Sequence, residues 1–296
     1  MKVYCFALFA CAFNLLVGYA GLLAFGHAAF FGAASYVSAF ALKSWGWPME
    51  VAIIASVISS AALGLVFGAI AIRRTGIYFA MITLALSQII YFMAVQLPFT
   101  QGEDGIHGVP RPPLLGFINV SSDEQLYYFV LAVFVFGFLA IYRIVHSPFG
   151  HTMRSIRDNE TRAISLGYDT QHYKLGVFVL SAAIAGLAGG TKAAVVQLAS
   201  LTDVHFQMSG EVILMVIVGG VGTLWGPVIG AALIVAMHDY LASIGEWMIV
   251  IQGLLFLAVV QFFRRGIMGE LLALLSRIGL RKGTDKNEAT TGETLA

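Results

Sequence analysis

The stretch GYAGLLAFGHAAFFGAASY, residues 18–36, places four glycines and one histidine inside an apolar run. Glycine reaches backbone conformations that other residues avoid and lets two backbones approach closely. Irregular backbone at membrane depth is tolerated only where protein or water covers it. We therefore predict that this stretch is a rigid break between two membrane helices, held inside the protein.

The composition indicates that most of this surface faces lipid. The chain has 296 residues, of which 59% are hydrophobic and 11% are charged, and its mean hydropathy is +0.85. A soluble domain carries about 25% charged residues. The net charge of +1 gives no reason to expect a nucleic-acid partner. The composition predicts a multi-pass membrane protein whose first partner is membrane lipid.

Nine apolar segments are candidates for membrane helices, since a helix needs about 20 apolar residues to cross a bilayer. They are residues 3–17, 28–42, 50–72, 77–96, 126–142, 174–191, 209–222, 226–241 and 247–263. The first, second, seventh and eighth are short, as expected beside a turn buried in protein. The predicted fold is an all-α polytopic transmembrane bundle of about nine helices.

The sequence offers no pattern typical of an enzyme. Cys5 and Cys11 lie six positions apart in the first segment, off a common helix face, and are expected to stay unpaired. The seven histidines are scattered without metal-ligand spacing. The chain has no G-x-x-x-x-G-K-[ST] phosphate loop. We predict no catalytic residue, no metal and no bound cofactor, so that any energy source must arrive through a partner.

Lysine and arginine predict the orientation, because they concentrate on the cytoplasmic side. Three basic clusters fall on one side if nine helices are counted: Arg73 and Arg74; Arg143, Arg154, Arg157 and Arg162; and those within residues 264–286. That side is predicted to be the cytoplasm, which places the C-terminus inside and the N-terminus outside. Lys2 fits this poorly, so either a preceding helix is absent from this chain or the count is wrong by one.

Two regions are predicted along the chain. Residues 1–263 form the transmembrane domain, and residues 264–296 form a cytoplasmic juxtamembrane helix with a polar tail. The first part of the tail, GIMGELLALLSRIGLRK, is apolar and basic and is expected to lie on the anionic inner leaflet. The last part, TDKNEATTGETLA, is predicted to be disordered.

A second glycine-rich break, GGVGTLWGPVIGAAL, spans residues 219–233. Breaks in comparable places are typical of transporters built from two related halves, with the substrate path at their interface. The alternative is close helix packing through small residues, as Ala182, Gly186 and Gly190 suggest by their spacing. The candidates at the breaks are Gly18, Gly21, Gly26, His27, Gly32, Gly219, Gly220, Gly222 and Gly226.

The loop of residues 147–174 is too long for a simple connection between helices. Ser147 and Pro148 predict a helix start, and Gly167 predicts a left-handed helix end. Between them, apolar residues recur on one face, and Arg154, Asp158 and Arg162 are spaced for successive ion pairs. The mixed charge favours an amphipathic helix that docks into a partner protein over one that lies in lipid headgroups.

These stretches resemble a known family. NLLVGYAGLLAFGHAAFFGAASY, RTGIYFAMITLALSQIIYF with QGEDGIHGVP, SPFGHTMRSIRDNETRAISLGY, YKLGVFVLSAAIAGLAGG and GEVILMVIVGGVGTLWGPVIGAAL occur in the order seen in the permease subunits of branched-chain amino acid ABC importers. They cover residues 14–233. The chain is most similar to the longer of the two permease partners, in a family that also carries urea and amides.

The resemblance implies a role for the loop of residues 147–174. In ABC importers a cytoplasmic helix of the permease inserts into an ATPase subunit, through a motif with Glu, Ala and a following Gly. Glu160, Ala163 and Gly167 stand at those positions, whereas Thr161 and Arg162 replace residues that are often small or apolar. The candidates for coupling to the ATPase are therefore Ile156, Arg157, Glu160, Ala163 and Gly167.

The resemblance also implies partners and a location. The partners are a related second permease subunit, two ATP-binding cassette ATPase subunits and a periplasmic or lipid-anchored substrate-binding protein, in the bacterial inner membrane. The loop of residues 100–113 either faces that binding protein or is simply solvated. The expected substrates are branched-chain amino acids, with urea, short amides or other amino acids as the alternative. An ion-coupled transporter and an intramembrane enzyme are remoter alternatives.

Four polar residues inside the apolar segments remain open to two interpretations. His27 either serves function at membrane depth or, as a neutral imidazole, binds turn carbonyls and holds the first break together. Glu211 either meets a substrate ammonium group or lies at a helix N-terminus, where the dipole favours a carboxylate. Asn14 and Gln88 either line a substrate path or hydrogen-bond between helices.

Overall fold

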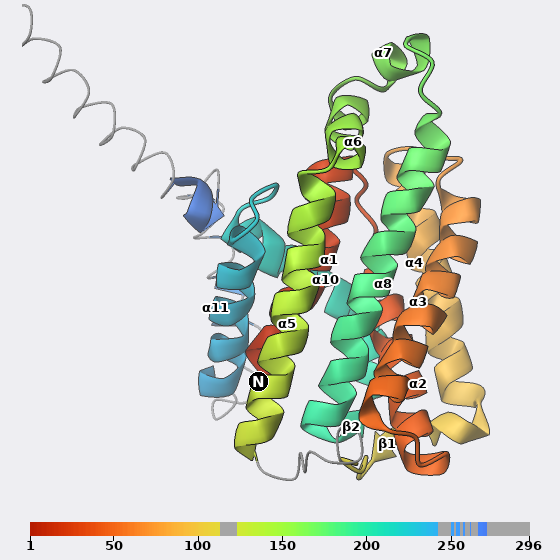
Figure 1. Cartoon of the computed structure of the whole chain (residues 1–296), viewed down its shortest axis with the longest axis vertical. Helices are drawn as coiled ribbons and strands as arrows, with labels where there is room; N and C mark the ends of the chain where they lie inside the picture. Colours follow the sequence, from red (N-terminus) through yellow and green to blue (C-terminus); the bar gives the residue numbers. More distant parts are fainter. Residues whose placement is uncertain are drawn as a thin grey trace, which may run out of the picture.

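The computed structural model describes residues 1–112 and 123–241, positions 250, 251, 253, 254, 257 and 261, and residues 266–270. Helices make up most of this part of the chain (Figure 1). Its strands are two short segments, β1 (Ile106–His107) and β2 (Leu198–Ala199). The predicted all-α fold is confirmed.

The helices follow the predicted apolar segments closely. In chain order they are α1 (Lys2–Asn14) with the π-helical turn η1 (Leu15–Tyr19), α2 (His27–Ser44), α3 (Met49–Ala71), α4 (Ile77–Gln96), the 3₁₀ turn η2 (Pro98–Thr100), α5 (Asp123–Val145), α6 (Pro148–Asp158), α7 (Glu160–Ser165), α8 (Thr170–Val196), α9 (Leu201–Val204), α10 (Phe206–Gly219) and α11 (Gly226–Leu241). Eight of the nine predicted spans coincide with one of these helices. The ninth, residues 247–263, lies largely outside the described residues, as does most of the tail.

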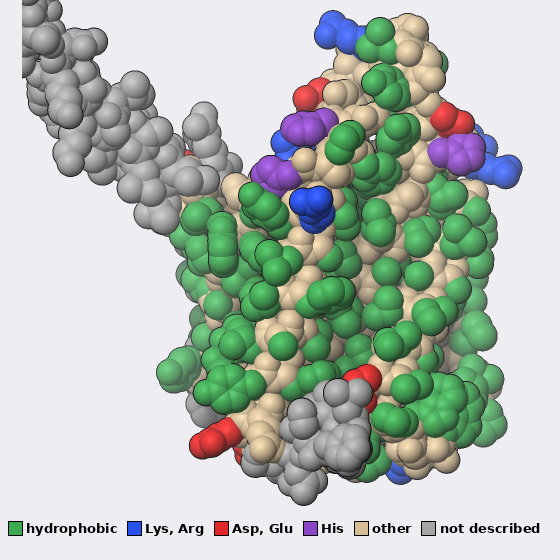
Figure 2. Space-filling model, viewed as in Figure 1, with side chains coloured by type: hydrophobic (Ala, Val, Ile, Leu, Met, Phe, Trp, Pro, Cys, Tyr) green, Lys and Arg blue, Asp and Glu red, His purple; other side chains and the backbone are tan. Residues whose placement is uncertain are grey.

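Five segments of the described chain are long and apolar enough to cross a membrane: α1 with η1, α3, α4, α5 and α8. Most residues of α1 with η1 and of α8 are buried, and these two segments form the centre of the bundle. In α3, α4 and α5 only about a third of the residues, or fewer, are buried. Their exposed side chains are large and apolar, as Ile58, Met81 and Phe136 illustrate. Figure 2 shows this apolar surface between two ends that carry the charges. The chain is a multi-pass membrane protein.

The lengths of the broken helices differ in part from expectation. Residues Lys2–Tyr19 form one 18-residue span, and α2 also has 18 residues, so the prediction of two short N-terminal segments is wrong. The π-helical turn carries the first helix beyond the predicted end at residue 17. Helices α10 and α11, with 14 and 16 residues, are short as predicted.

Small residues bring α8 close to α2 and α3. A Cβ atom added to Gly186 would meet Ser60 at 2.6 Å, and one added to Gly190 would collide with Ser56. Ser56 Oγ donates to the Gly186 carbonyl at 3.3 Å, and Ser38 Oγ donates to that of Gly190 at 3.2 Å. Small residues with hydroxyl hydrogen bonds are the usual means of packing helices in lipid. The packing interpretation of these glycines is confirmed.

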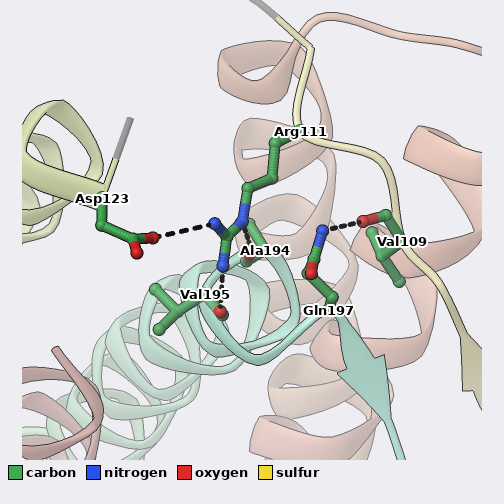
Figure 3. Close-up of polar contacts among 6 residues, drawn as sticks. All are labelled: Val109, Arg111, Asp123, Ala194, Val195 and Gln197. Carbon is green, nitrogen blue, oxygen red and sulfur yellow. Dashed lines mark hydrogen bonds and ion pairs between the residues drawn. The ribbon is translucent and has the colours of Figure 1, made fainter. Parts of the chain in front are cut away.

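The two ends of the bundle differ. One end carries α6 and α7, and the other carries the antiparallel pair β1–β2, with Ile106 opposite Ala199 (Figure 1). At this second end Arg111 donates to the Val195 carbonyl at 2.8 Å and pairs with Asp123 at 3.3 Å (Figure 3). A cation at the last carbonyls of α8 is favourable because the helix dipole is negative there. The described part of this loop, residues 100–112, is therefore bound to the end of α8.

Candidate functional site

Helix α6 begins where the sequence predicts. The Ser147 side chain accepts a hydrogen bond from the Gly150 backbone N–H at 3.3 Å, and Pro148 occupies the first helical position. Serine before proline satisfies one exposed N–H and supplies a φ suited to the first turn. A Cβ atom on Gly150 would lie 2.5 Å from the carbonyl oxygens of Ile144 and Val145, so the turn from α5 into α6 is tight.

The loop contains two helices where one was predicted. Asn159 separates α6 from α7 in an extended conformation with φ −158°. Its side chain accepts from the Arg162 N–H at 2.9 Å and caps α7. The predicted ion pairs of Asp158 with Arg154 and Arg162 are wrong, because the break takes Arg162 off the α6 face. Asp158 pairs with its neighbour Arg157 at 2.9 Å.

Gly167 ends α7 in the left-handed conformation that the sequence predicts, with φ +86°. Its N–H donates to the Ile164 carbonyl at 2.9 Å, and the Tyr168 N–H donates to the Ala163 carbonyl at 3.1 Å. These two bonds close the end of the helix. A Cβ atom at Gly167 would meet nothing within 4 Å, so the glycine is required by the backbone conformation and not by space.

The five coupling candidates divide into buried and bonded groups. Ile156 and Ala163 are each 4% exposed, and Ala163 lies at the base of a groove described below. The Glu160 carboxylate binds Lys174 Nζ at 2.5 Å, which ties α7 to the first turns of α8. The coupling candidates therefore serve in part to hold α6 and α7 in place, and not all five face outward.

The outward surface of the unit is a groove that the sequence did not single out. It has a volume of about 440 Å³ and runs between α6 and α7, past Ser155, Arg162 and Leu166. Leu166 is 71% exposed, and Tyr168 is 44% exposed. Both residues come just after the predicted apolar stripe in sequence. Both line the groove.

Helix α6 is bound directly to the first glycine break. Arg157 Nη1 donates to the Gly18 carbonyl at 2.5 Å, and the Arg157 side chain lies over Gly21, where an added Cβ atom would come within 2.8 Å. The guanidinium of Arg154 lies 5.1 Å from the centre of the Tyr19 ring. The last carbonyls of a helix have no partner within it, so an arginine is a suitable donor there.

The two glycine breaks touch each other through Asn14. Its Nδ2 donates to the Thr223 carbonyl at 2.8 Å, and its Oδ1 accepts from the Gly222 N–H at 2.9 Å. A Cβ atom on Gly18 would lie 2.6 Å from the Gly222 nitrogen. The amide of Asn14 thus uses a donor and an acceptor to join segments 208 residues apart. Of its two interpretations, the structure gives Asn14 the hydrogen bonds between segments.

His27 lies fully buried at the start of α2, and it does not bind turn carbonyls. Its Nε2 lies 3.2 Å from Ser181 Oγ on α8, and its Nδ1 has no partner among the described residues. The ring stacks on Phe9 at 5.7 Å and meets Phe13 and Phe30 edge-on. The expectation that the histidine holds the turn through carbonyls is wrong, because the α1 and α2 phenylalanines surround it.

The other residues at the breaks divide between close packing and turn formation. A Cβ atom on Gly26 would collide with the Thr83 carbonyl of α4, and one on Gly32 would collide with Val204. In the second break, Gly219 and Gly226 touch backbone to backbone, and Gly220 has φ +117°. Gln88 is half-buried on α4, away from this network.

Glu211 does not lie at a helix N-terminus. Helix α10 begins at Phe206 with His205 as its N-cap, and its first turn holds no acidic residue. Because the dipole acts mainly within the first turn, the capping interpretation of Glu211 is wrong. Glu211 is half-buried and lines a cavity with Lys192, Asp203 and His238.

A buried ion pair that was not predicted from the sequence lies at this cavity. Lys192 Nζ and Asp203 Oδ2 are 2.6 Å apart, and their side chains are 7% and 3% exposed. The predicted span ended at residue 191, whereas α8 continues to Val196, so Lys192 lies inside a membrane helix. A lysine inside an apolar helix is the signal that would have found it.

At the other end of α8, Asp169 caps the helix. Its Oδ1 accepts from the His172 N–H at 3.3 Å, and its Oδ2 lies 2.6 Å from His172 Nδ1. These hydrogen bonds from His172 lower the pKa of the Asp169 carboxyl below its ordinary value. The charged form of Asp169 is therefore the form that stabilises this helix start.

The fold and this network define a helical membrane protein whose glycine-broken core is bound to the helix pair α6–α7 at one end of the bundle (Figure 1). Residues 1–260 match the family described as "Branched-chain amino acid transport system / permease component". The chain belongs to that family.

Two bacterial relatives are similar over most of this chain. It is 28% identical over 271 residues to "High-affinity branched-chain amino acid transport system permease protein LivM" of Salmonella typhimurium and 27% identical to the protein of that name from Escherichia coli. Each alignment covers 83% of this chain and 64% of the relative, so the chain spans less than two thirds of their length. The "Probable branched-chain amino acid transport permease protein LivM" of Methanocaldococcus jannaschii is 26% identical over 46% of this chain and 41% of its own. No solved structure matches.

Proposed function

We propose that this chain is a permease subunit of an ABC importer that carries branched-chain amino acids across the bacterial inner membrane. Family membership and the names of the relatives support the substrate class. The observation that carries the mechanism is the bond between Arg157 of α6 and Gly18 of the first break, since α6 lies outside the membrane span. A movement imposed on α6 would reach the membrane core through it.

The α6–α7 end is proposed to face the cytoplasm. Arg143, Arg154, Arg157 and Arg162 lie in or beside these helices, and Arg73 lies next to the start of α8 at the same end. Arginine-rich connections stay on the cytoplasmic side. This orientation places β1–β2 and the loop of residues 100–113 outside, where a substrate-binding protein would dock. It also places residues 264–296 inside if nine helices cross the membrane.

The groove between α6 and α7 is proposed as the place where an ATPase subunit docks. It combines exposed apolar side chains, Leu166 and Tyr168, with the polar Ser155 and Arg162. A short helix pair with an apolar ridge suits insertion into a cleft of a partner. The partners would be a related second permease, two ATPase subunits that use the ATP, and a periplasmic or lipid-anchored binding protein. The permease itself would bind no cofactor.

Reconstitution tests this proposal. The complete importer is placed in liposomes with ATP on the α6–α7 side and the binding protein on the other side, and labelled leucine is measured inside. We expect accumulation that requires ATP and both ATPase subunits and that persists with ionophores present. Accumulation driven by an ion gradient without the ATPase subunits would overturn the proposal.

The same liposomes test the substrate class. Unlabelled isoleucine and valine should compete with leucine, whereas urea and acetamide should not. Effective competition by urea or acetamide would assign the protein to the amide branch of its family.

Orientation is tested by placing a cysteine at an exposed position, Leu166→Cys, in a chain whose own Cys5 and Cys11 are buried. Labelling by an impermeant thiol reagent should require access to the cytoplasmic side.

A further inference from the structure

A cavity of about 390 Å³ opens between α1, α8, α9, α10 and α11, towards the β1–β2 end of the bundle. Its volume lies within the roughly 300–1,000 Å³ range typical of small-molecule sites. The cavity is separate from the α6–α7 network, since none of its lining residues belongs to those two helices. In the proposed orientation it is the part of the membrane core nearest the outside.

Opposite charges line this cavity. On one side lies the Lys192–Asp203 pair, which is held in place from two directions. Lys192 Nζ also donates to the Leu198 carbonyl at 3.4 Å, and Asp203 Oδ2 also accepts from the Ser200 N–H at 3.3 Å. A paired lysine that is fixed in this way keeps donor capacity towards the cavity, because an ammonium group has three N–H bonds.

On the other side lie Glu211 of α10 and His238 of α11. Within the described residues, the Glu211 carboxylate forms no hydrogen bond or ion pair; His238 is the group beside it that attracts its charge, and the buried Nε2 of His238 has no hydrogen-bond partner. A half-buried carboxylate without a partner in a membrane bundle is costly unless something with a positive charge occupies the space beside it.

The remaining wall is partly apolar, and Lys2 and Asp239, which pair at 3.7 Å, also line it. Phe6, Met208, Met215 and Val235 lie on it, from α1, α10 and α11. Methionine is flexible and adapts to aliphatic groups of different shape. The cavity therefore offers a carboxylate, an ammonium donor and an apolar surface within one space, which are the three features that an aliphatic α-amino acid requires.

We propose that this cavity binds the zwitterion of an aliphatic amino acid during transport, with its ammonium group at Glu211, its carboxylate beside Lys192 and its side chain on the Met208–Met215–Val235 wall. This deepens the proposed function and rests on it. Glu211 acts as a specificity-determining residue, because a substrate without an ammonium group would leave its carboxylate unpaired.

Photocrosslinking tests the proposal on the complete importer. A leucine analogue with a diazirine in its side chain is irradiated with the complex, and adducts are mapped by mass spectrometry. We expect adducts on α10 and α11 around Met208, Met215 and Val235, and competition by leucine but not by its 2-hydroxy-acid analogue. Adducts confined to other surfaces of the permease would overturn the proposal.

Two matched variants sharpen the test. Glu211→Gln removes the charge from a side chain that forms no hydrogen bond or ion pair within the described residues, and Glu124→Gln makes the same change at an exposed site on α5 at the same end. Glu211→Gln should lower the adduct yield about tenfold, the effect of one lost charge contact, and Glu124→Gln should not change it. Equal yields in both variants would refute a role for Glu211.

The outcomes separate this inference from the proposed function. Monodispersity and subunit composition of the Glu211→Gln complex confirm that it is assembled. If that variant transports and labels as the wild type does, the site is wrong while the importer function stands. If the wild-type complex shows no ATP-dependent leucine uptake, the proposed function is wrong whatever the labelling shows.

Discussion

Arg157 of α6 donates a hydrogen bond to the carbonyl of Gly18, a residue 139 positions earlier in the chain, at a distance of 2.5 Å. Gly18 in turn packs against Gly222, and Asn14 binds the Gly222–Thr223 backbone. One contact of α6 is thereby linked to both glycine breaks.

Replacing Arg157 with glutamine should weaken the link between α6 and the first break. A charged hydrogen bond is worth about 1.5–3 kcal/mol, so we expect ATP-driven uptake to fall by about tenfold or more while ATP hydrolysis continues. Arg143→Gln is the control, because Arg143 is exposed at the end of α5 and loses the same charge. Equal uptake by the two variants would show that Arg157 does not couple the helices.

Gly18→Ala should destabilise the protein, because its methyl group would lie 2.6 Å from the Gly222 nitrogen. Overpacking of this kind costs about 1–3 kcal/mol. The matched change is Gly210→Ala in α10, where a Cβ atom meets nothing within 4 Å. Thermal unfolding in detergent should show a lower Tm for Gly18→Ala, by several degrees, and an unchanged or higher Tm for Gly210→Ala. A reversed order would contradict the packing of the two breaks.

Gly167→Val should abolish uptake without preventing membrane insertion. Valine is strongly disfavoured at φ +86°, so the end of α7 would unwind and displace Tyr168 from the groove. Gly167→Asn should retain most of the uptake, because asparagine tolerates the left-handed conformation. Uptake and the amount of permease in the membrane are measured together for both variants. Full uptake by the valine variant would exclude a role for this helix end.

Asp169→Asn should reduce stability at neutral pH but not in acid. The pKa of Asp169 is lowered by its bonds to His172, so its contribution to stability is present above the ordinary aspartate pKa of about 4 and is lost as the pH falls through the lowered value. The Tm difference between wild type and variant should therefore shrink as the pH falls below about 4. A difference that is independent of pH would assign the effect to the hydrogen bonds alone.

Local patterns predicted the helices and their ends well. Residues close together in the chain determine the eight apolar spans, the Ser147 cap and the left-handed conformation of Gly167. The errors were also local in origin. Asn159 caps a new helix, so a continuous amphipathic pattern became two helices, and the π-helical turn η1 extends α1 to Tyr19.

The partners of the polar residues were beyond the reach of the sequence. His27 lies among phenylalanines beside Ser181, Glu211 faces a cavity instead of capping a helix, and Lys192 meets Asp203 across the end of α8. Each of these environments is built by residues from different helices. Hydropathy marks such positions as unusual in an apolar helix but contains no information on which distant side chain is opposite.

The sequence by itself determined that this is a helical membrane protein of a recognisable transport family, because lipid exposure imposes an apolar composition on every span and glycine, serine and proline act on their own backbone. Only the tertiary structure decided that Arg157, Gly18, Asn14 and Gly222 form one connected network. The physical reason is that such contacts depend on how closely separate backbones approach, and that distance is set by the packing of the whole bundle.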